Sequence, residues 1–264
     1  MKKVNIIFIF VLILATCLQA KVWVSPPYKE ILISNDKSKK YVVYYTIGNT
    51  AENDVTIYVE LKNGRQFLKD GAKNPGKPLP VSHWVNYDGE KVFTLKANER
   101  KKLVFFIIPP GGDYTDMSAF ISFIIDEGTM IKSAITVPFY AIVKENAEFD
   151  LAIKDFELIK KSTDNLDYIC QIKIIFKNHS NIHIRPKASL VIKDENSKPV
   201  KHINMGDLAP MFDTGDIQYS NDLDLKLGKG KYTAELYVKY YFFQKELKMS
   251  KQFEVNEKGE CVFY

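Results

Sequence analysis

The stretch AITVPFYAIV, residues 134–143, is dominated by apolar, β-branched and aromatic residues, a composition that predicts a β-strand. Pro138 lies in its middle and has no backbone N–H to give to a ladder. A strand that contains it is therefore expected at a sheet edge or at a bulge. Two interpretations remain open: an open edge that pairs with another chain, and an interior closing strand with a bulge at Pro138.

The same kind of pattern runs through the rest of the 264-residue chain. Short β-rich runs are broken by turn residues about every ten positions, which is typical of β-sandwiches. Asn63-Gly64 predicts a tight turn after the alternating run 55–59, and the proline- and glycine-rich residues 70–80 predict a long irregular loop. The expected strands are 29–33, 41–47, 55–61, 91–95, 103–108, 119–125 and 133–143, then 151–159, 168–176, 188–193, 222–227, 232–241 and 246–255.

Two segments with similar features lie 129 residues apart, TIGNTAENDVTIYVEL around Asn49 and IIFKNHSNIHIRPKASLVI around Asn178. Each consists of a predicted strand, an Asn at the turn, a polar loop and a second strand. A strand end and a turn begin at Leu95, 46 residues after Asn49, and again at Leu225, 47 residues after Asn178. This spacing predicts two domains of one fold.

The predicted fold class is all-β, with two immunoglobulin-like β-sandwich domains in tandem. We expect the domains at residues 21–145 and 146–264, joined at the charged stretch 144–148. A linker this short favours a bent, fairly fixed pair of domains.

Residues 1–20 have the features of a secretory signal peptide. Lys2 and Lys3 precede an apolar run at 6–15, which is too short to span a bilayer comfortably. Cleavage after Ala20 would release a periplasmic protein. The alternative is a lipoprotein signal, because Leu-Ala-Thr before Cys17 has the order of a bacterial lipobox; the protein would then be lipid-anchored or on the outer surface.

Charge and motifs exclude several functions. The formal net charge is +5, of which Lys2 and Lys3 contribute two, and lysines alternate with acids throughout. This pattern indicates a solvated surface and no nucleic-acid partner. The sequence holds no Gly-x-Ser-x-Gly, His-Glu-x-x-His, phosphate-binding loop or dinucleotide fingerprint. We therefore expect no enzymatic activity and no cofactor.

Two polar clusters contain residue types that can bind metal ions. His179 and His183 have a spacing that could hold a metal on a helix, but they fall in a turn before a predicted strand, which indicates turn or surface histidines. The carboxylates at 213, 216, 222 and 224 match no EF-hand loop and indicate a solvated loop. No metal site is predicted.

Cys170 and Cys261 are the cysteines outside the signal segment, and both lie in the second half of the chain. In an exported protein we predict a disulfide that ties the C-terminal tail to a strand of that half. The alternative is two free buried thiols.

The first half resembles the PapD-like periplasmic pilus chaperones. The similarity lies in Val24-Ser25-Pro26, in Gly48-Asn49-Thr50 at a strand end, and in FTLKANERKKLV at 93–104 leading to Pro109-Pro110. Ala97-Asn98 stands where that family typically has Pro-Gly. The second half, with NHSNIHIRPKASLVIKDENSKPV and LGKGKYTAELYVKYYF, is similar to immunoglobulin-like modules of bacterial surface proteins.

The resemblance implies donor-strand complementation, in which the last strand of the first domain completes a partner's unfinished sheet. The inserted face would be Ile135, Val137, Phe139 and Ala141. The family also anchors the partner's terminal carboxylate with two basic residues. Lys29 is the candidate for the first, and Lys132 is the candidate for the second.

The sequence thus predicts a periplasmic chaperone or assembly factor that binds protein subunits of a pilus or surface structure by edge-strand donation. The alternative is a non-catalytic structural or adhesive component of the cell surface. A membrane association is expected only if Cys17 is lipidated.

Overall fold

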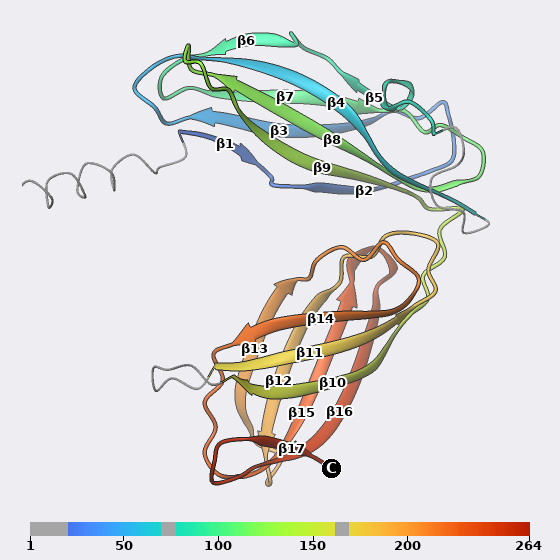
Figure 1. Cartoon of the computed structure of the whole chain (residues 1–264). Helices are drawn as coiled ribbons and strands as arrows, with labels where there is room; N and C mark the ends of the chain where they lie inside the picture. The colour runs from blue at the N-terminus through green and yellow to red at the C-terminus, as the bar shows by residue number, and fades with distance from the viewer. Residues whose placement is uncertain (1–20, 70–77, 162–168) are drawn as a thin grey trace, which may run out of the picture. The chain divides into compact units, whose positions relative to one another are not determined.

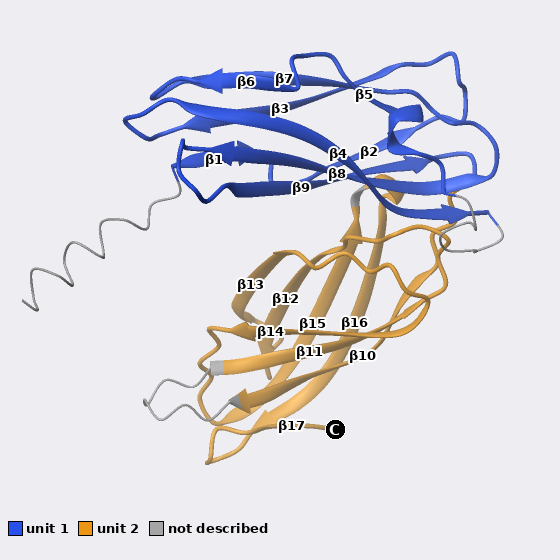
Figure 2. Ribbon diagram, turned by 45° about the horizontal axis from the view of Figure 1, so that its top comes forward, with its two compact units in different colours: residues 1–146 blue, residues 147–264 orange. Residues whose placement is uncertain are grey.

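The computed structural model describes residues 21–69, 78–161 and 169–264. The predicted signal segment with Cys17, most of the predicted loop at 70–80 and Tyr168 lie outside the described residues. The chain divides into two compact units, residues 1–146 and 147–264 (Figure 2). Among the described residues no helix is long and apolar enough to cross a membrane.

Unit 1 is a sandwich of two sheets (Figure 1). One sheet has the strand order β1-β3-β7-β5, with β1 (Val22–Ser25), β3 (Tyr41–Asn49), β7 (Arg100–Ile107) and β5 (Val85–Tyr87). The other has the order β2-β9-β8-β4-β6, with β2 (Lys29–Ile33), β9 (Ser133–Val143), β8 (Tyr114–Asp126), β4 (Val55–Leu68) and β6 (Val92–Leu95). A short 3-10 helix, η1 (Val81–His83), precedes β5.

Unit 2 is a second sandwich. Its smaller sheet has the order β10-β11-β14, with β10 (Leu151–Lys161), β11 (Ile169–Asn178) and β14 (Gly215–Leu223). Its larger sheet has the order β13-β12-β15-β16-β17, with β13 (Pro199–Asp207), β12 (Lys187–Asp194), β15 (Gly230–Tyr240), β16 (Lys245–Val255) and β17 (Cys261–Phe263). The 3-10 helix η2 (Tyr241–Phe243) links β15 to β16.

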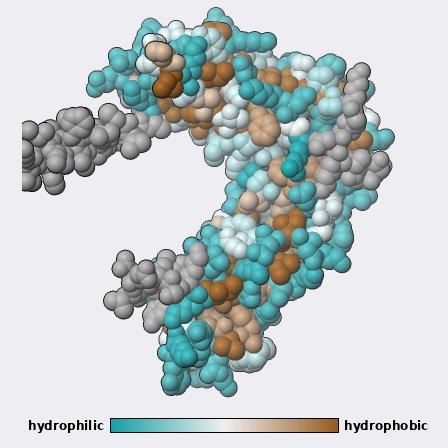
Figure 3. Space-filling model, viewed as in Figure 1, coloured by the Kyte–Doolittle hydropathy of each residue, from teal (hydrophilic) through white to brown (hydrophobic). Residues whose placement is uncertain are grey.

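Strand alternation builds each core. In β3 the side chains of Val43, Tyr45 and Ile47 are buried, whereas those of Val42 and Tyr44, on the opposite face, are exposed. Trp84 is fully buried in the same core. On the face seen in Figure 3, hydrophobic residues are interspersed with hydrophilic ones on both units. The predicted fold class, two immunoglobulin-like β-sandwiches, is confirmed.

Two local predictions are wrong. Asn63-Gly64 does not form a tight turn, because β4 continues through it to Leu68 and the β4–β8 register shifts between Asn63 and Gln66. The Asn63 side chain accepts a hydrogen bond from the Val81 N–H instead, at 2.6 Å. The strand expected at 222–227 lies earlier, as β14.

The two asparagines that suggested a repeat occupy equivalent positions. Asn49 ends β3 and Asn178 ends β11, and both are buried. Each side-chain oxygen accepts a bond from the N–H two residues later, Ala51 at 2.9 Å and Ser180 at 3.1 Å.

The side-chain amide nitrogen of each asparagine also donates hydrogen bonds to backbone carbonyls of a segment distant in the sequence. Asn49 Nδ2 donates to the carbonyls of Leu95 and Lys96, at 3.3 and 3.1 Å, which are the residues the repeat had paired with it. Asn178 Nδ2 donates to Asp213 at 3.0 Å, and not to the segment that begins at Leu225. The two units therefore share the asparagine turn, but the segment to which the asparagine side chain donates is the predicted one only in unit 1.

We expect Asn49→Ala and Asn178→Ala each to lower the free energy of unfolding by about 2–3 kcal/mol, because each leaves buried backbone groups without partners. Urea unfolding followed by fluorescence measures the change. Asn86→Ala is the control, since Asn86 is exposed in β5. If the free energy of unfolding changes by the same small amount in all three variants, the two asparagine turns do not stabilise the fold as proposed.

Unit 2 holds a nearly buried acid on its larger sheet. Glu235 in β15 accepts hydrogen bonds from Tyr237 at 2.7 Å and from Lys248 at 3.0 Å, and it pairs with Lys193 at 3.0 Å. The bond from Tyr237, with those from the two lysines, lowers the pKa of Glu235 from 4.5 to about 2.

Because the folded-state pKa of Glu235 is lowered, its ionised form stabilises unit 2 above about pH 4.5, and this stabilisation is lost as the pH falls toward 2. We expect Glu235→Gln to lower the free energy of unfolding by roughly 1–2 kcal/mol at neutral pH. The difference from wild type should shrink as the pH falls through this window.

Unfolding measured from pH 7 to pH 2 tests this expectation. Glu246→Gln is the matched control, because the Glu246–Lys239 pair is largely exposed and should contribute little. A pH-independent effect of Glu235→Gln would contradict the assignment.

Candidate partner-binding edge

Strand β9 is paired along nearly its whole length on one side and along about half of it on the other. Antiparallel β8 pairs with it from Ser133, opposite Ile125, to Ile142. Parallel β2 pairs with it only from Phe139, opposite Lys29, to Val143. In the described part of the chain no strand pairs with the other side of residues 133–138, here called the open edge.

The open edge exists because the first strand of the domain is divided between the two sheets. Its first part, β1, pairs with β3 from Val22, opposite Asn49, to Ser25, opposite Thr46. Residues 26–28, which include two prolines, then lead into β2 in the other sheet. Since proline cannot donate to a ladder, this segment is suited to leave one sheet and enter the other.

Pro138 lies at the sheet edge and not at a bulge. It lies opposite Phe120 of β8, and the β8–β9 register has no shift, so the bulge alternative is wrong. Pro138 is the last residue before the pairing with β2 begins. The strand is thus at the sheet edge as far as Pro138 and inside the sheet beyond it.

The predicted inserted face is directed into the domain's own core. Val137, Phe139 and Ala141 are only 2%, 1% and 0% exposed, and Ile135 is partly buried against the same core. The Phe139 ring lies 5.9 Å from that of Trp84. In this structure these side chains cannot enter a partner's groove, because the core of unit 1 already occupies them.

The side chains accessible at the open edge are different ones. Ala134 and Thr136 are exposed on the outer face, where Thr136 shares a 2.9 Å hydrogen bond with Ser122. The preceding turn exposes Met130 fully and Ile131 to 81%. Sequence reasoning missed these two; an apolar pair inside the polar turn GTMIKS was the available signal.

The two candidate carboxylate anchors do not form one site. Lys29 lies opposite Phe139, whereas Lys132 comes just before β9 begins. Seven residues of strand separate these levels, about 23 Å. Lys132 is instead paired with Asp126 at 2.9 Å. Its hydrogen bond lowers the pKa of Asp126, and the same bond raises the pKa of Lys132.

The other candidate residues lie apart from this edge. Cys170 and Cys261 are free thiols in unit 2, and the predicted bridge between them stays a prediction. His183 is fully buried and stacks on Phe212, so it is not a surface histidine. Within the described ranges no three His, Cys, Asp or Glu side chains are grouped so that they could hold a metal ion.

Comparison with known proteins finds similarity at the level of structure. No family model and no curated protein matches the sequence. Solved structures of similar layout include the chaperone–tip subunit complex CsuC–CsuE of archaic Csu pili from Acinetobacter baumannii, with 13% identity, 88% of this chain and 98% of that chain covered, and a TM-score of 0.42.

Two further structures are also those of chaperones. The class 5 fimbriae chaperone CfaA has 10% identity, covers 88% of this chain and 98% of its own, and gives a TM-score of 0.39. The SafB chaperone bound to the SafA pilin of Salmonella enterica has 12% identity, with coverages of 86% and 95% and a TM-score of 0.37. These comparisons report only what the chain resembles, and no site residue is carried over from them.

We expect Phe139→Ala to destabilise unit 1 by about 3–5 kcal/mol, because it leaves a cavity beside Trp84. Ala134→Ser, at an exposed position of the same strand, should change the stability by less than about 0.5 kcal/mol. Urea unfolding followed by Trp fluorescence measures both. A stable, folded Phe139→Ala variant would indicate that the apolar face of β9 is not core.

Proposed function

We propose that this protein is an exported chaperone or assembly factor, and that it binds β-rich subunits of a pilus or surface structure through the open edge of β9. The observation that carries the proposal is the one-sided pairing of residues 133–138. A strand edge with unpaired backbone groups is a template for a strand of another chain.

The size of the open edge fits strand addition. Six residues extend about 20 Å, enough for the backbone of one short strand. The added strand would lie beside β9, in line with β2, at the place left open because the preceding strand β1 belongs to the other sheet. Its affinity would come mainly from main-chain hydrogen bonds.

Side chains near the open edge would add apolar contacts. Ile135 is partly buried at this edge, and Met130 and Ile131 are exposed beside it. A partner strand with apolar residues at alternate positions would cover them. The proposed mechanism is therefore edge donation by the backbone, with the apolar face of β9 kept in its own core.

The charges of the two units favour the edge in unit 1. Residues 133–138 contain no charged side chain. Within the described chain, strand β16 of unit 2 also has no second partner strand over residues 245–251, but that stretch carries Lys245, Glu246, Lys248 and Lys251. Charged side chains, lysine above all, protect an edge against pairing.

The proposal includes the compartment. The predicted signal peptide at residues 1–20 would deliver the protein to the periplasm, where unfinished surface subunits need protection from aggregation. The protein would act by binding, without a cofactor and without nucleic acid. Lipidation at Cys17 would attach the same protein to a membrane.

Site-specific photo-crosslinking tests the proposal. A photoreactive amino acid is placed at Ala134 or Thr136 in cells that make the protein, and at Thr94 as control, an exposed position in β6 at the opposite edge of the same sheet. We expect adducts with a small β-rich surface subunit from positions 134 and 136 and none from position 94.

Hydrogen exchange on the purified complex supplies a second measurement. Amides in residues 133–138 should exchange at least about tenfold more slowly when the subunit is bound. Adducts from all three positions alike, or protection only elsewhere, would contradict edge pairing and favour a structural or adhesive component of the surface.

A further inference from the structure

The end of the chain lies across unit 2 as a short edge strand. β17 pairs with β16 in three positions, from Val255 opposite Cys261 to Phe253 opposite Phe263. Phe263 packs its ring 5.3 Å from that of Phe253 and 6.0 Å from that of Phe156 in the other sheet. β17 therefore closes one side of the sandwich with few backbone bonds.

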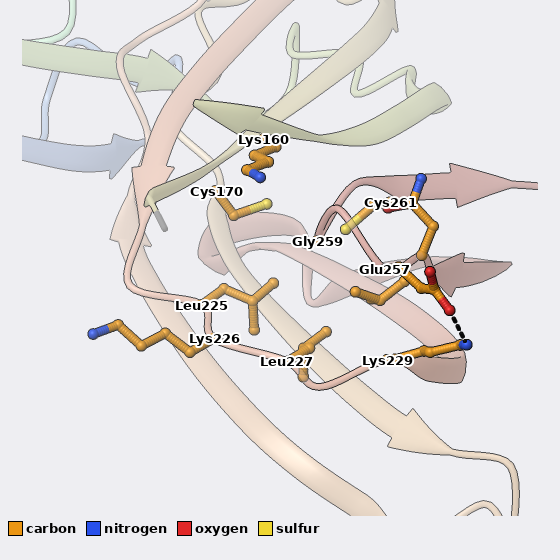
Figure 4. Close-up of a pocket in the computed structure, with 11 residues that line it drawn as sticks. Lys160, Cys170, Leu225, Lys226, Leu227, Lys229, Glu257, Gly259 and Cys261 are labelled. Atoms are coloured by element: carbon orange, nitrogen blue, oxygen red, sulfur yellow. Dashed lines mark hydrogen bonds and ion pairs between the residues drawn. The ribbon is translucent and has the colours of Figure 1, made fainter. Parts of the chain in front are cut away.

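Cys261 at the start of β17 faces a cysteine of the opposite sheet. Cys170, near the start of β11, is 5% exposed, and Cys261 is partly exposed. Both line a cavity of about 240 Å³, together with Lys160, Leu225 and Gly259. Figure 4 shows the two side chains pointing toward one another.

We propose that Cys170 and Cys261 form a disulfide that latches β17 across the sandwich of unit 2, and that Cys261 is the thiol that reacts first. The bridge would join the two sheets, since β11 belongs to the smaller and β17 to the larger. This inference is independent of the partner-binding edge in unit 1.

The order of reaction follows from the surroundings of the two thiols. Cys261 is the more accessible, and a hydrogen bond from the Cys170 thiol lowers the pKa of Cys261. The same hydrogen bond and burial raise the pKa of Cys170 well above its ordinary value. The nucleophilic thiolate is thus expected at Cys261, where it can be reached from solvent.

The step balances with a small-molecule or protein disulfide as oxidant. The Cys261 thiolate attacks one sulfur of that disulfide and forms a mixed disulfide, releasing one thiol. Cys170 then loses its proton and attacks the Cys261 sulfur, releasing the second thiol. Two protons and two electrons leave the protein, and the oxidant is reduced to two thiols.

The latch would have two physical effects. It closes a loop from residue 170 to residue 261, and long loops gain most from a crosslink because the unfolded chain loses many conformations. It also fixes β17 against residues 253–255 of β16. Glu254 is the one charged side chain in this part of β16, whereas the first part of the strand carries several. An unlatched β17 would leave this end of β16 open to another chain.

The test uses the chain from residue 21 to 264, the form left by the predicted cleavage. The reduced protein is incubated with oxidised glutathione and denatured, and its thiols and intact mass are measured. We expect both thiols to disappear and the mass to fall by two hydrogen atoms. Two remaining thiols, or only disulfide-linked dimers, would overturn the proposal.

Two variants test the order of reaction. In Cys170→Ser the accessible Cys261 should accumulate a glutathione adduct, because no second thiol resolves it. In Cys261→Ser the buried Cys170 should react at least about tenfold more slowly. Equal adduct formation in both would overturn the assignment of Cys261 as the first nucleophile, and circular dichroism verifies that both variants are folded.

Hydrogen exchange tests the latch itself. Amides of residues 261–263 should exchange at least about tenfold faster in the reduced protein than in the oxidised one. Residues 187–194 of β12, which lie between two strands, should be unaffected. The same rate at 261–263 in both states would show that the bridge does not hold β17.

Discussion

The division of the first strand between two sheets is the constraint on which the proposed site depends. One strand of ordinary length cannot cover the edges of both sheets completely. β1 covers β3 from Thr46 to Asn49, and β2 covers β9 from Phe139 onward. Residues 41–45 of β3 and 133–138 of β9 are left without a partner strand on that side, within the described chain. These two stretches have different neighbours. Beside the start of β3 lies the loop at 34–40, in which the Ser34 N–H donates a hydrogen bond to the Tyr41 hydroxyl. Before β9 lie the exposed side chains of Met130 and Ile131.

Strand β9 shows what sequence alone can and cannot supply. Its bounds were predicted correctly, because composition and turn residues determine where a strand runs. The use of its apolar face was not, because alternation is the same whether the face packs on its own core or on a partner's. Trp84 and Phe139 are 55 residues apart in the sequence, and their rings are in contact, which no local sequence pattern indicates. Pro138 was a better guide to the open edge than the alternation of apolar residues, because it is the last position before pairing with β2 begins.

Local hydrogen bonds explain why the repeated asparagine turn could be predicted from the sequence, and tertiary pairing explains why the predicted turn at Asn63-Gly64 was wrong. Asn49 and Asn178 each end a strand by bonding the N–H two residues on, and this local motif is visible in sequence. Asn63-Gly64 has the composition of a hairpin turn, yet β4 runs on, with Gly64 packed so tightly on Ser118 that a Cβ would lie 2.2 Å from its hydroxyl. A register shift against β8 accommodates the extra residues. Tertiary pairing thus overrides local turn preference where a long neighbouring strand is present.

The two units protect their last long hairpins by different means. In unit 2, charged side chains cover the first part of the exposed side of β16, and β17 pairs with its end. In unit 1, β2 pairs with the end of β9, and the first part has neither a partner strand nor a charge. An uncharged strand edge without a partner strand is an aggregation hazard that folded proteins normally avoid. This difference between the two units is the reason for placing the proposed strand addition at β9 of unit 1 and not at β16 of unit 2.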